Sequence, residues 1–195
     1  MTVSKSGQVG LKKLHFALQT KDDSSAATYD VPELIAPAVN VKITPKTDSV
    51  TDYGDDGAVD TASALGEIDV EIETTSLPLD IQAKLLGHKY QNGLLVKGTD
   101  DIAPYVAIGF EAPKSDGSKL FVWLYKGKFD LLESEHKTKQ DKVEFQHPKL
   151  KAKFVRREFD KNWQVSGDTS DTAFTLANTW FTKVIAPADA TAPQV

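Results

Sequence analysis

The chain has 195 residues, with 23 basic and 28 acidic side chains for a formal net charge of −5, and it contains no cysteine. This length suits one domain whose core buries roughly 70% of the unfolded chain's surface. The lack of cysteine excludes disulfides, iron–sulfur clusters and cysteine-ligated zinc, and the acidic balance argues against a protein that mainly grips phosphate backbones. The N-terminus is too polar for a signal peptide and no apolar run approaches a membrane span, so we expect a soluble protein made in the cytoplasm.

The first third of the chain predicts strands and one long loop. Residues 11–18 and 39–44 read as strands, although prolines between residues 29 and 46 indicate edge or irregular structure there. Residues 45–63 show no helical or strand periodicity and are rich in aspartate, and loops this long are uncommon unless they are functional. We expect this loop to protrude and to make an intermolecular contact. Its candidate residues are Asp48, Asp52, Tyr53, Asp55, Asp56 and Asp60.

The aspartates of this loop do not make an EF-hand. With Asp52 as the first ligand, Gly54 occupies the third position and Ser63 the twelfth, where a bidentate glutamate belongs. An irregular calcium site stays open as an alternative, but we predict no metal here.

Strict alternation follows the loop. Across residues 66–74, Ile68, Val70 and Ile72 face one way, which predicts a strand with one buried side. The other side carries only acids, namely Glu67, Asp69, Glu71 and Glu73.

One helix is predicted, over residues 77–86. Pro78 suits its first turn, Leu77, Ile81 and Leu85 form an apolar stripe, and Gly87 is a natural terminator. A helix this short is marginal alone and must pack on the sheet.

The second half of the chain again predicts strands. Residues 105–110 and 120–129 flank an Asp-Gly turn at residues 115–117, and the apolar LFVWLYKGKF at 120–129 indicates cover on both faces. Further strands are predicted at residues 141–146, 149–154 and 163–165. The Ala- and Pro-rich residues 186–195 read as a flexible arm. We therefore predict that residues 1–185 form a mainly β domain, an antiparallel sandwich or barrel with one flanking α-helix and a long protruding loop.

Catalytic motifs are not evident. The four histidines (His15, His88, His136 and His147) do not fall in a HExxH or HxH arrangement, and the chain has no P-loop, GxGxxG or GxSxG. A triad assembled in space stays open, but we expect no enzyme activity and no cofactor.

The charges are unevenly distributed. Residues 46–73 hold nine acidic and one basic side chain, a net of −8, whereas residues 114–161 hold thirteen basic and eight acidic ones, a net of +5. Three interpretations stay open: a solvated strand face, pairing of the acidic strand with Lys149, Lys151 and Lys153 in one sheet, or a contact between an acidic surface of one copy and a basic surface of the next.

Segments along most of residues 9–184 resemble a known family in their order and spacing. They are VGLKKLHFAL, YGDDGAVDTASALGEIDVEIETTSLPLDIQAKLLGHKY, APYVAIGF, LFVWLYKGKF, KTKQDKVEFQHPKLKAKFVRRE and TWFTKV. In these the chain is similar to the major tail protein, or tail tube protein, of long-tailed, non-contractile bacteriophages that infect Gram-positive bacteria.

The resemblance implies a structural virion protein rather than an enzyme. Members form six-membered rings that stack into a tube, a long loop bridges successive rings, and DNA passes through an acidic lumen without specific binding. It further implies a tape measure protein and a tail terminator as partners, assembly in the host cytoplasm, a final location in the virion tail and no membrane contact. The acids of residues 67–73 then become candidates for the lumen, and the aspartate-rich loop for the bridge between rings.

Two other function classes stay open. The first is a carbohydrate- or receptor-binding β-sandwich, in which Trp123, Trp163 and Trp180 would form an exposed platform, although aromatic side chains of this size are more often in the core. The second is an enzyme on a β-sandwich.

Overall fold

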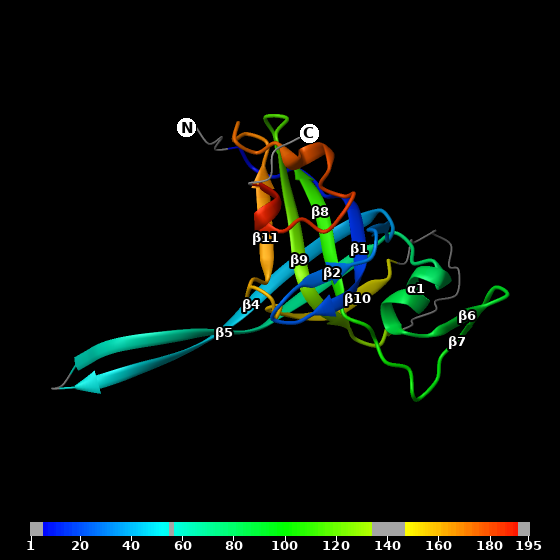
Figure 1. The fold of residues 1–195 in the computed structure, drawn as a ribbon, viewed down its shortest axis with the longest axis horizontal. Coiled ribbons are helices and arrows are strands. Elements are labelled where there is room, and N and C mark those ends of the chain that lie inside the picture. The colour runs from blue at the N-terminus through cyan, green and yellow to red at the C-terminus, as the bar shows by residue number, and fades with distance from the viewer. Residues whose placement is uncertain (1–5, 55–56, 134–146, 191–195) are drawn as a thin grey trace, which may run out of the picture.

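The computed structural model describes residues 6–54, 57–133 and 147–190. Most of these residues lie in one antiparallel sheet with the order β2-β1-β8-β9-β10-β5-β4, to which β3 adds against β1 and β11 against β9 (Figure 1). Its strands are β1 (Lys12–Asp22), β2 (Ala27–Tyr29), β3 (Glu33–Leu34), β4 (Ala38–Gly54), β5 (Gly57–Thr74), β8 (Val106–Pro113), β9 (Lys119–Phe129), β10 (Lys149–Val155) and β11 (Gln164–Asp168). The prediction of a mainly β, antiparallel protein is confirmed, and the arrangement is consistent with a β-sandwich.

Strand β9 organises the sheet because its second edge is shared by two strands. The first half of β9 pairs with β11, and its last residues pair with β10. The two halves of the sheet therefore diverge and enclose the main core, which includes Val122 and Leu124 of β9. The residues that alternate with them, Phe121, Trp123 and Tyr125, belong to a second core on the opposite face. The expectation that residues 120–129 are covered on both faces is confirmed.

The C-terminal segment covers this second core. It contains two short 3₁₀ helices, η1 (Leu176–Asn178) and η2 (Pro187–Ala190). The Tyr125 hydroxyl donates to the carbonyl of Ile185 at 2.9 Å, and Lys183 pairs with Asp189 at 2.6 Å. The prediction of a flexible arm over residues 186–195 is therefore wrong for residues 186–190, because Ile185 is buried and anchors the turn that follows. Residues 191–195 lie outside the described part.

The predicted helix is confirmed as α1 (Leu79–Leu86), and Ile81, Leu85 and Leu86 belong to the main core. Gly87 ends it in the left-handed region, with a φ of 73°, where a Cβ would lie 2.1 Å from the carbonyl oxygen of Ile102. A small hairpin follows, β6 (Lys89–Gln91) and β7 (Leu94–Val96). Its Asn92-Gly93 turn has positive φ at both positions, as a type I′ turn requires.

The predicted loop over residues 45–63 is wrong, because this segment is the outer part of a hairpin between β4 and β5. Its described side chains, at residues 45–49 and 63, are exposed on successive positions, so no buried face imposes a period there, and the backbone ladder defines the strands. Pro45 lies at a register shift in β4, and β4 pairs with β5 alone in the sheet path, so the missing N–H is tolerated at an edge strand. The strand predicted at residues 141–146 lies outside the described residues.

Arg157, which follows β10, is buried beside the second core. Its guanidinium donates to both carboxylate oxygens of Asp160, at 2.6 and 2.5 Å, and lies 3.7 Å from the ring centroid of Tyr125. The hydrogen bond from Arg157 holds the pKa of Asp160 at about 2, below its ordinary value of 3.8. The Arg157 guanidinium therefore links the residues after β10 to the Tyr125 ring, whose hydroxyl also binds the C-terminal segment.

We predict that Asp160→Asn makes stability less dependent on pH in acid. Because the folded pKa of Asp160 lies below its ordinary value, the carboxylate stabilises the fold fully above pH 4 and loses this effect as the pH falls towards 2. The variant should lose roughly 2 kcal/mol of unfolding free energy near neutral pH, and the difference should shrink between pH 4 and pH 2. Urea unfolding at several pH values measures it.

The matched control is Asp30→Asn, an exposed carboxylate in the loop before β3. This variant should follow the wild-type curve throughout. A difference between wild type and Asp160→Asn that stayed constant from pH 7 to pH 2 would contradict the account of Asp160.

Candidate functional site

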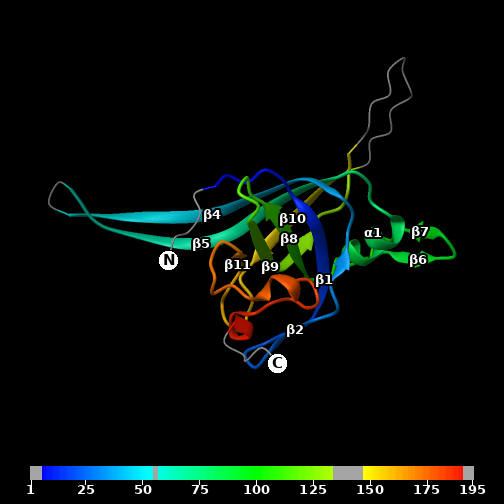
Figure 2. The same ribbon diagram turned by 90° about the horizontal axis from the view of Figure 1, so that it is seen from above.

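The most distinctive feature of the molecule is the length of the β4–β5 hairpin. We call residues 47–66 the distal hairpin, and residues 38–46 with 67–74 its base. Pairing in the distal hairpin runs from Thr47 opposite Leu65 to Gly54 opposite Gly57. Figures 1 and 2 show it leaving the body on the side away from α1, β6 and β7. At about 3.3 Å per residue it reaches roughly 25 Å beyond the base.

The distal hairpin has no core of its own where its side chains are described. Residues 47–49 and 63–66 are exposed on successive positions of both strands, and Leu65 keeps 43% of its surface accessible. Alternating burial resumes only at Ile68. The backbone ladder is therefore the main internal interaction along this part of the distal hairpin.

All of the net charge of the chain lies in the distal hairpin. It holds five acids and no basic residue, and the rest of the chain holds 23 of each sign, since 28 − 5 = 23. Asp52 and Asp60 occupy partner positions across the hairpin, and like charges at partner positions weaken pairing. Of the predicted contact residues, Asp48 is exposed on β4, Tyr53 is paired in register with Ala58, and Asp55 and Asp56 lie outside the described residues. An acidic arm thus projects from a neutral body.

The acidic face of β5 lies in the base, between two strands that carry lysines. In register, Glu73 lies opposite Lys149, Glu71 opposite Lys151, and Asp69 opposite Lys153. The other neighbour, β4, places Lys42 opposite Glu71. The apolar residues between these acids are buried, so the predicted alternation of residues 66–74 is confirmed.

Ion pairs join two of these four acids to neighbouring lysines, and a histidine ring lies near a third. Lys153 contacts Glu67 at 2.9 Å, Lys46 contacts Asp69 at 2.8 Å, and His147 lies 3.5 Å from Glu73. Hydrogen bonding by Lys46 lowers the pKa of Asp69, and hydrogen bonding by Glu67 raises the pKa of Lys153. The interpretation that the acidic strand pairs with Lys149, Lys151 and Lys153 in one sheet is confirmed by the register, and Lys153 also forms an ion pair with Glu67. The assignment of Glu67, Asp69, Glu71 and Glu73 to a lumen stays a prediction. The lysines of the facing strands balance them.

The described histidines make structural contacts. His15 stacks on Phe181 with 4.4 Å between ring centroids, and the buried His88 has its Nδ1 2.6 Å from the Asp101 carboxylate. In the described ranges, no group of three or more His, Asp or Glu side chains could hold a metal ion. His136 lies outside those ranges.

The three tryptophans do not form an exposed platform. Trp123 and Trp180 are buried in the second core, and the Trp123 indole donates to the carbonyl of Trp180 at 3.0 Å. Trp163 is half-buried against the main core. The sugar-binding surface that these residues were expected to offer is therefore absent.

Comparison with known proteins adds no relative. No protein-family model matches the chain, and no curated protein matches it. Among the described residues, no helix has the length and apolar character needed to cross a membrane.

We predict that Glu71→Lys destabilises the base in a salt-dependent way. The new cation would lie between Lys42 and Lys151, so three like charges would adjoin in the sheet. The melting temperature should fall by about 2–4 °C at low salt, as expected for a loss near 1 kcal/mol in a chain of this size. Salt at about 0.5 M should recover much of the loss by screening.

Glu133→Lys is the control, because Glu133 is 89% exposed and its ion pair with Lys151 is a surface pair. It should leave the melting temperature nearly unchanged. Equal losses in the two variants, or a loss for Glu71→Lys that salt does not reduce, would contradict the charge-balanced base.

Proposed function

We propose that the protein is a structural virion protein that polymerises as stacked rings into the tail tube of a long-tailed, non-contractile bacteriophage. The ring number of six follows from the family resemblance, as do a tape measure protein and a tail terminator as partners. It is made and assembled in the host cytoplasm, resides in the virion tail and has no catalytic role.

The observation that carries the proposal is the distal hairpin. Ordering a residue costs about 1–2 kcal/mol of backbone entropy, and segments with little apolar surface recover this cost poorly alone. Its described residues have no core, and its sequence carries five acids without a base. A neighbouring subunit would supply both the burial and the opposite charge. We assign the distal hairpin the role of bridge between successive rings.

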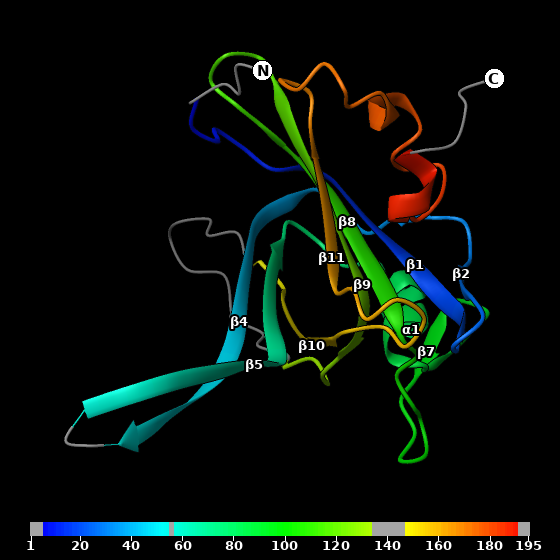
Figure 3. The same cartoon turned by 60° about the vertical axis from the view of Figure 1, so that its left-hand side comes forward.

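The asymmetry of the molecule favours an open assembly. The acidic arm leaves one side of a body that carries no net charge (Figure 3). A contact between such an arm and a different surface of the next copy is head-to-tail, and head-to-tail contacts close into rings or continue as filaments.

The charge pattern also suits a passage for DNA. Where the base face lines a bore, Lys153 and Lys46 form ion pairs with acids of β5, and Lys149 and Lys151 lie in register opposite others, so these lysines are less available to neutralise phosphates. Phosphate attachment strengthens with each cation that releases counterions, and a balanced wall lacks that gain. The distal hairpin adds only negative charge. Such a bore lets DNA slide.

A carbohydrate- or receptor-binding module is the other candidate. Its strongest feature in the sequence was the set of three tryptophans, and two of them are buried and the third is half-buried. No other described feature favours it over a polymer.

We predict that shortening the hairpin abolishes polymerisation and leaves the fold intact. Residues 50–62 are replaced by Asn-Gly, which joins the register partners Ser49 and Ser63 through a two-residue turn. Because the described residues on either side of the removed part, 47–49 and 63–66, are exposed, the body should keep its core and the melting temperature should stay within about 2 °C of wild type. Negative-stain electron microscopy of concentrated protein should show rings or tubes for wild type and none for the variant.

Two results would contradict the proposal. A wild-type protein that stays monomeric at every concentration tried would remove the polymer function. A shortened variant that still forms normal tubes would remove the bridging role of the distal hairpin.

A further inference from the structure

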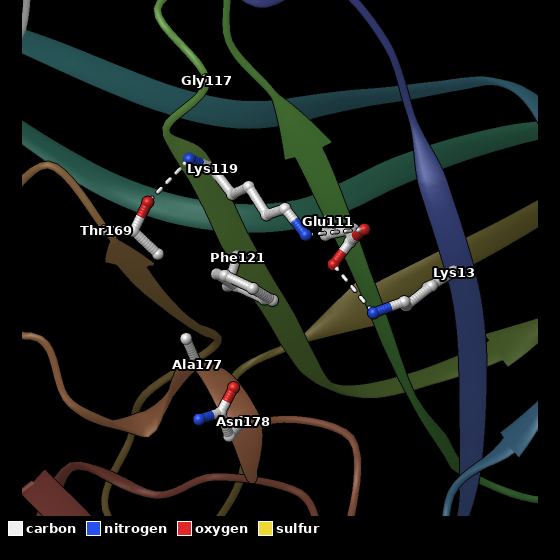
Figure 4. Close-up of a pocket in the computed structure, with 8 residues that line it drawn as sticks. All are labelled: Lys13, Glu111, Gly117, Lys119, Phe121, Thr169, Ala177 and Asn178. Atoms are coloured by element: carbon white, nitrogen blue, oxygen red, sulfur yellow. Dashed lines mark hydrogen bonds and ion pairs between the residues drawn. The ribbon is translucent and has the colours of Figure 1, made fainter.

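A polar depression of about 360 Å³ lies where β1, β8 and β9 meet the C-terminal segment (Figure 4). Lys13 comes from β1, Glu111 from β8 and Lys119 from β9, and Figure 4 shows the Glu111 side chain between the two lysines. The buried ring of Phe121 lies beside them, and Thr169 and Asn178 line the rim. This group of charges lies outside the β4–β5 base and the distal hairpin.

Glu111 holds the two lysines together. Its oxygens lie 3.3 Å from the Lys13 ammonium and 3.5 Å from the Lys119 ammonium. The Glu111 side chain is only 2% exposed, whereas those of Lys13 and Lys119 are 56% and 42% exposed. A molecule that enters the depression therefore meets two cations, because the carboxylate that balances one of them is out of reach.

These ion pairs leave donor capacity free. Glu111 Oε2 is buried and accepts no hydrogen bond from the described part of the chain, so Lys13 contacts it only as an ion pair. Each ammonium carries three donors, and a carboxylate accepts several hydrogen bonds. Thr169 already accepts from the Lys119 backbone N–H at 2.8 Å, which leaves its hydroxyl proton available. The depression is thus organised to receive one more carboxylate.

An unusual backbone conformation of β1 positions the Lys13 side chain beside the depression. β1 has a register shift between Lys12 and His15, and Lys13 has a φ of 53°, in the left-handed region that a lysine rarely adopts. Bulges of this kind re-aim side chains at functional positions. The neighbouring Lys114 offers no such site, because it is nearly buried and paired with Asp168.

We propose that this depression is the receptor for the distal hairpin of a second copy, with Lys13 and Lys119 binding its aspartate carboxylates. The inference rests on the proposed function and names the surface that the bridge contacts. Charge complementarity selects the occupant: the distal hairpin carries five acids and no base, and the depression exposes two cations over a buried acid. Figure 3 places the distal hairpin away from the β8–β9 turn that flanks the depression, so the contact is head-to-tail.

The test is the double variant Lys13→Glu/Lys119→Glu, which reverses the accessible charge. We expect the concentration needed for assembly to rise about tenfold or more, since opposing like charges across an interface costs affinity. Lys13→Arg/Lys119→Arg should assemble as wild type does. Lys97→Glu, a reversal on an exposed lysine after β7, is the matched control and should assemble normally. Sedimentation velocity and electron microscopy measure assembly, and circular dichroism confirms folding.

A compensating variant separates a specific contact from a general charge effect. Asp48→Lys/Asp52→Lys/Asp60→Lys should fail to assemble alone, and combining it with Lys13→Glu/Lys119→Glu in one chain should restore assembly. If the charge-reversed receptor does not fold, Lys13→Gln/Lys119→Gln replaces it, with a smaller loss of assembly expected.

The outcomes distinguish the two proposals. Assembly of Lys13→Glu/Lys119→Glu at the wild-type concentration would overturn the receptor and leave the tail tube function standing. Failure to restore assembly in the combined variant would likewise overturn the pairing of these two surfaces. A wild-type protein that never assembles would overturn the proposed function itself, and the depression would then bind an acidic partner other than this chain or nothing.

Discussion

The structure depends on the pairing of β5 between β10 and β4. One face of β5 places Ile68, Val70 and Ile72 in the main core, and the other places four acids among the lysines of its neighbours. In the distal hairpin, residues 47–66, both the apolar core and the balancing lysines are missing: its described side chains are exposed, and its sequence has no basic residue. The same two strands therefore belong to the packed sheet at one end and form a projecting arm at the other.

The body and the distal hairpin therefore differ in net charge. In the body, acids and bases are equal in number and many form short ion pairs, so it presents little long-range field. The distal hairpin carries the whole net charge and must find its counter-charges outside itself. Because exposed charges are screened over about 8–10 Å at physiological ionic strength, a contact through them is sensitive to salt. Arms that repel one another in dilute solution also oppose premature association through like surfaces.

The sequence predicts those parts of the fold in which one face is buried, because burial of one face makes apolar residues recur at a regular spacing. Alternation identified residues 66–74 and 149–154, and the capping signals identified α1 within two residues at its start. For the distal hairpin the sequence predicts a loop, because it has no apolar/polar alternation, and its described residues 47–49 and 63–66 are exposed on successive positions. The β6–β7 hairpin is not predicted, although Asn92-Gly93 is a typical hairpin turn. Its two strands have only three residues each, which is too short to show an alternating pattern.

The candidate surfaces were predictable to different degrees. The acidic character of residues 48–60 is visible in the sequence, and so was the option that the lysines of β10 balance the acids of β5. The depression was not visible, because Lys13, Glu111 and Lys119 meet only through the strand order β1-β8-β9. Isolated charges in three segments give no signal until the sheet is known.

The central claim is that the distal hairpin is an intermolecular element, and amide hydrogen exchange tests it most directly. Exchange is followed by mass spectrometry on dilute monomer and on assembled protein. We expect residues 47–66 to exchange rapidly in the monomer and to become strongly protected on assembly, while residues 67–74 are protected in both states. Equal exchange of residues 47–66 in the two states would contradict the account.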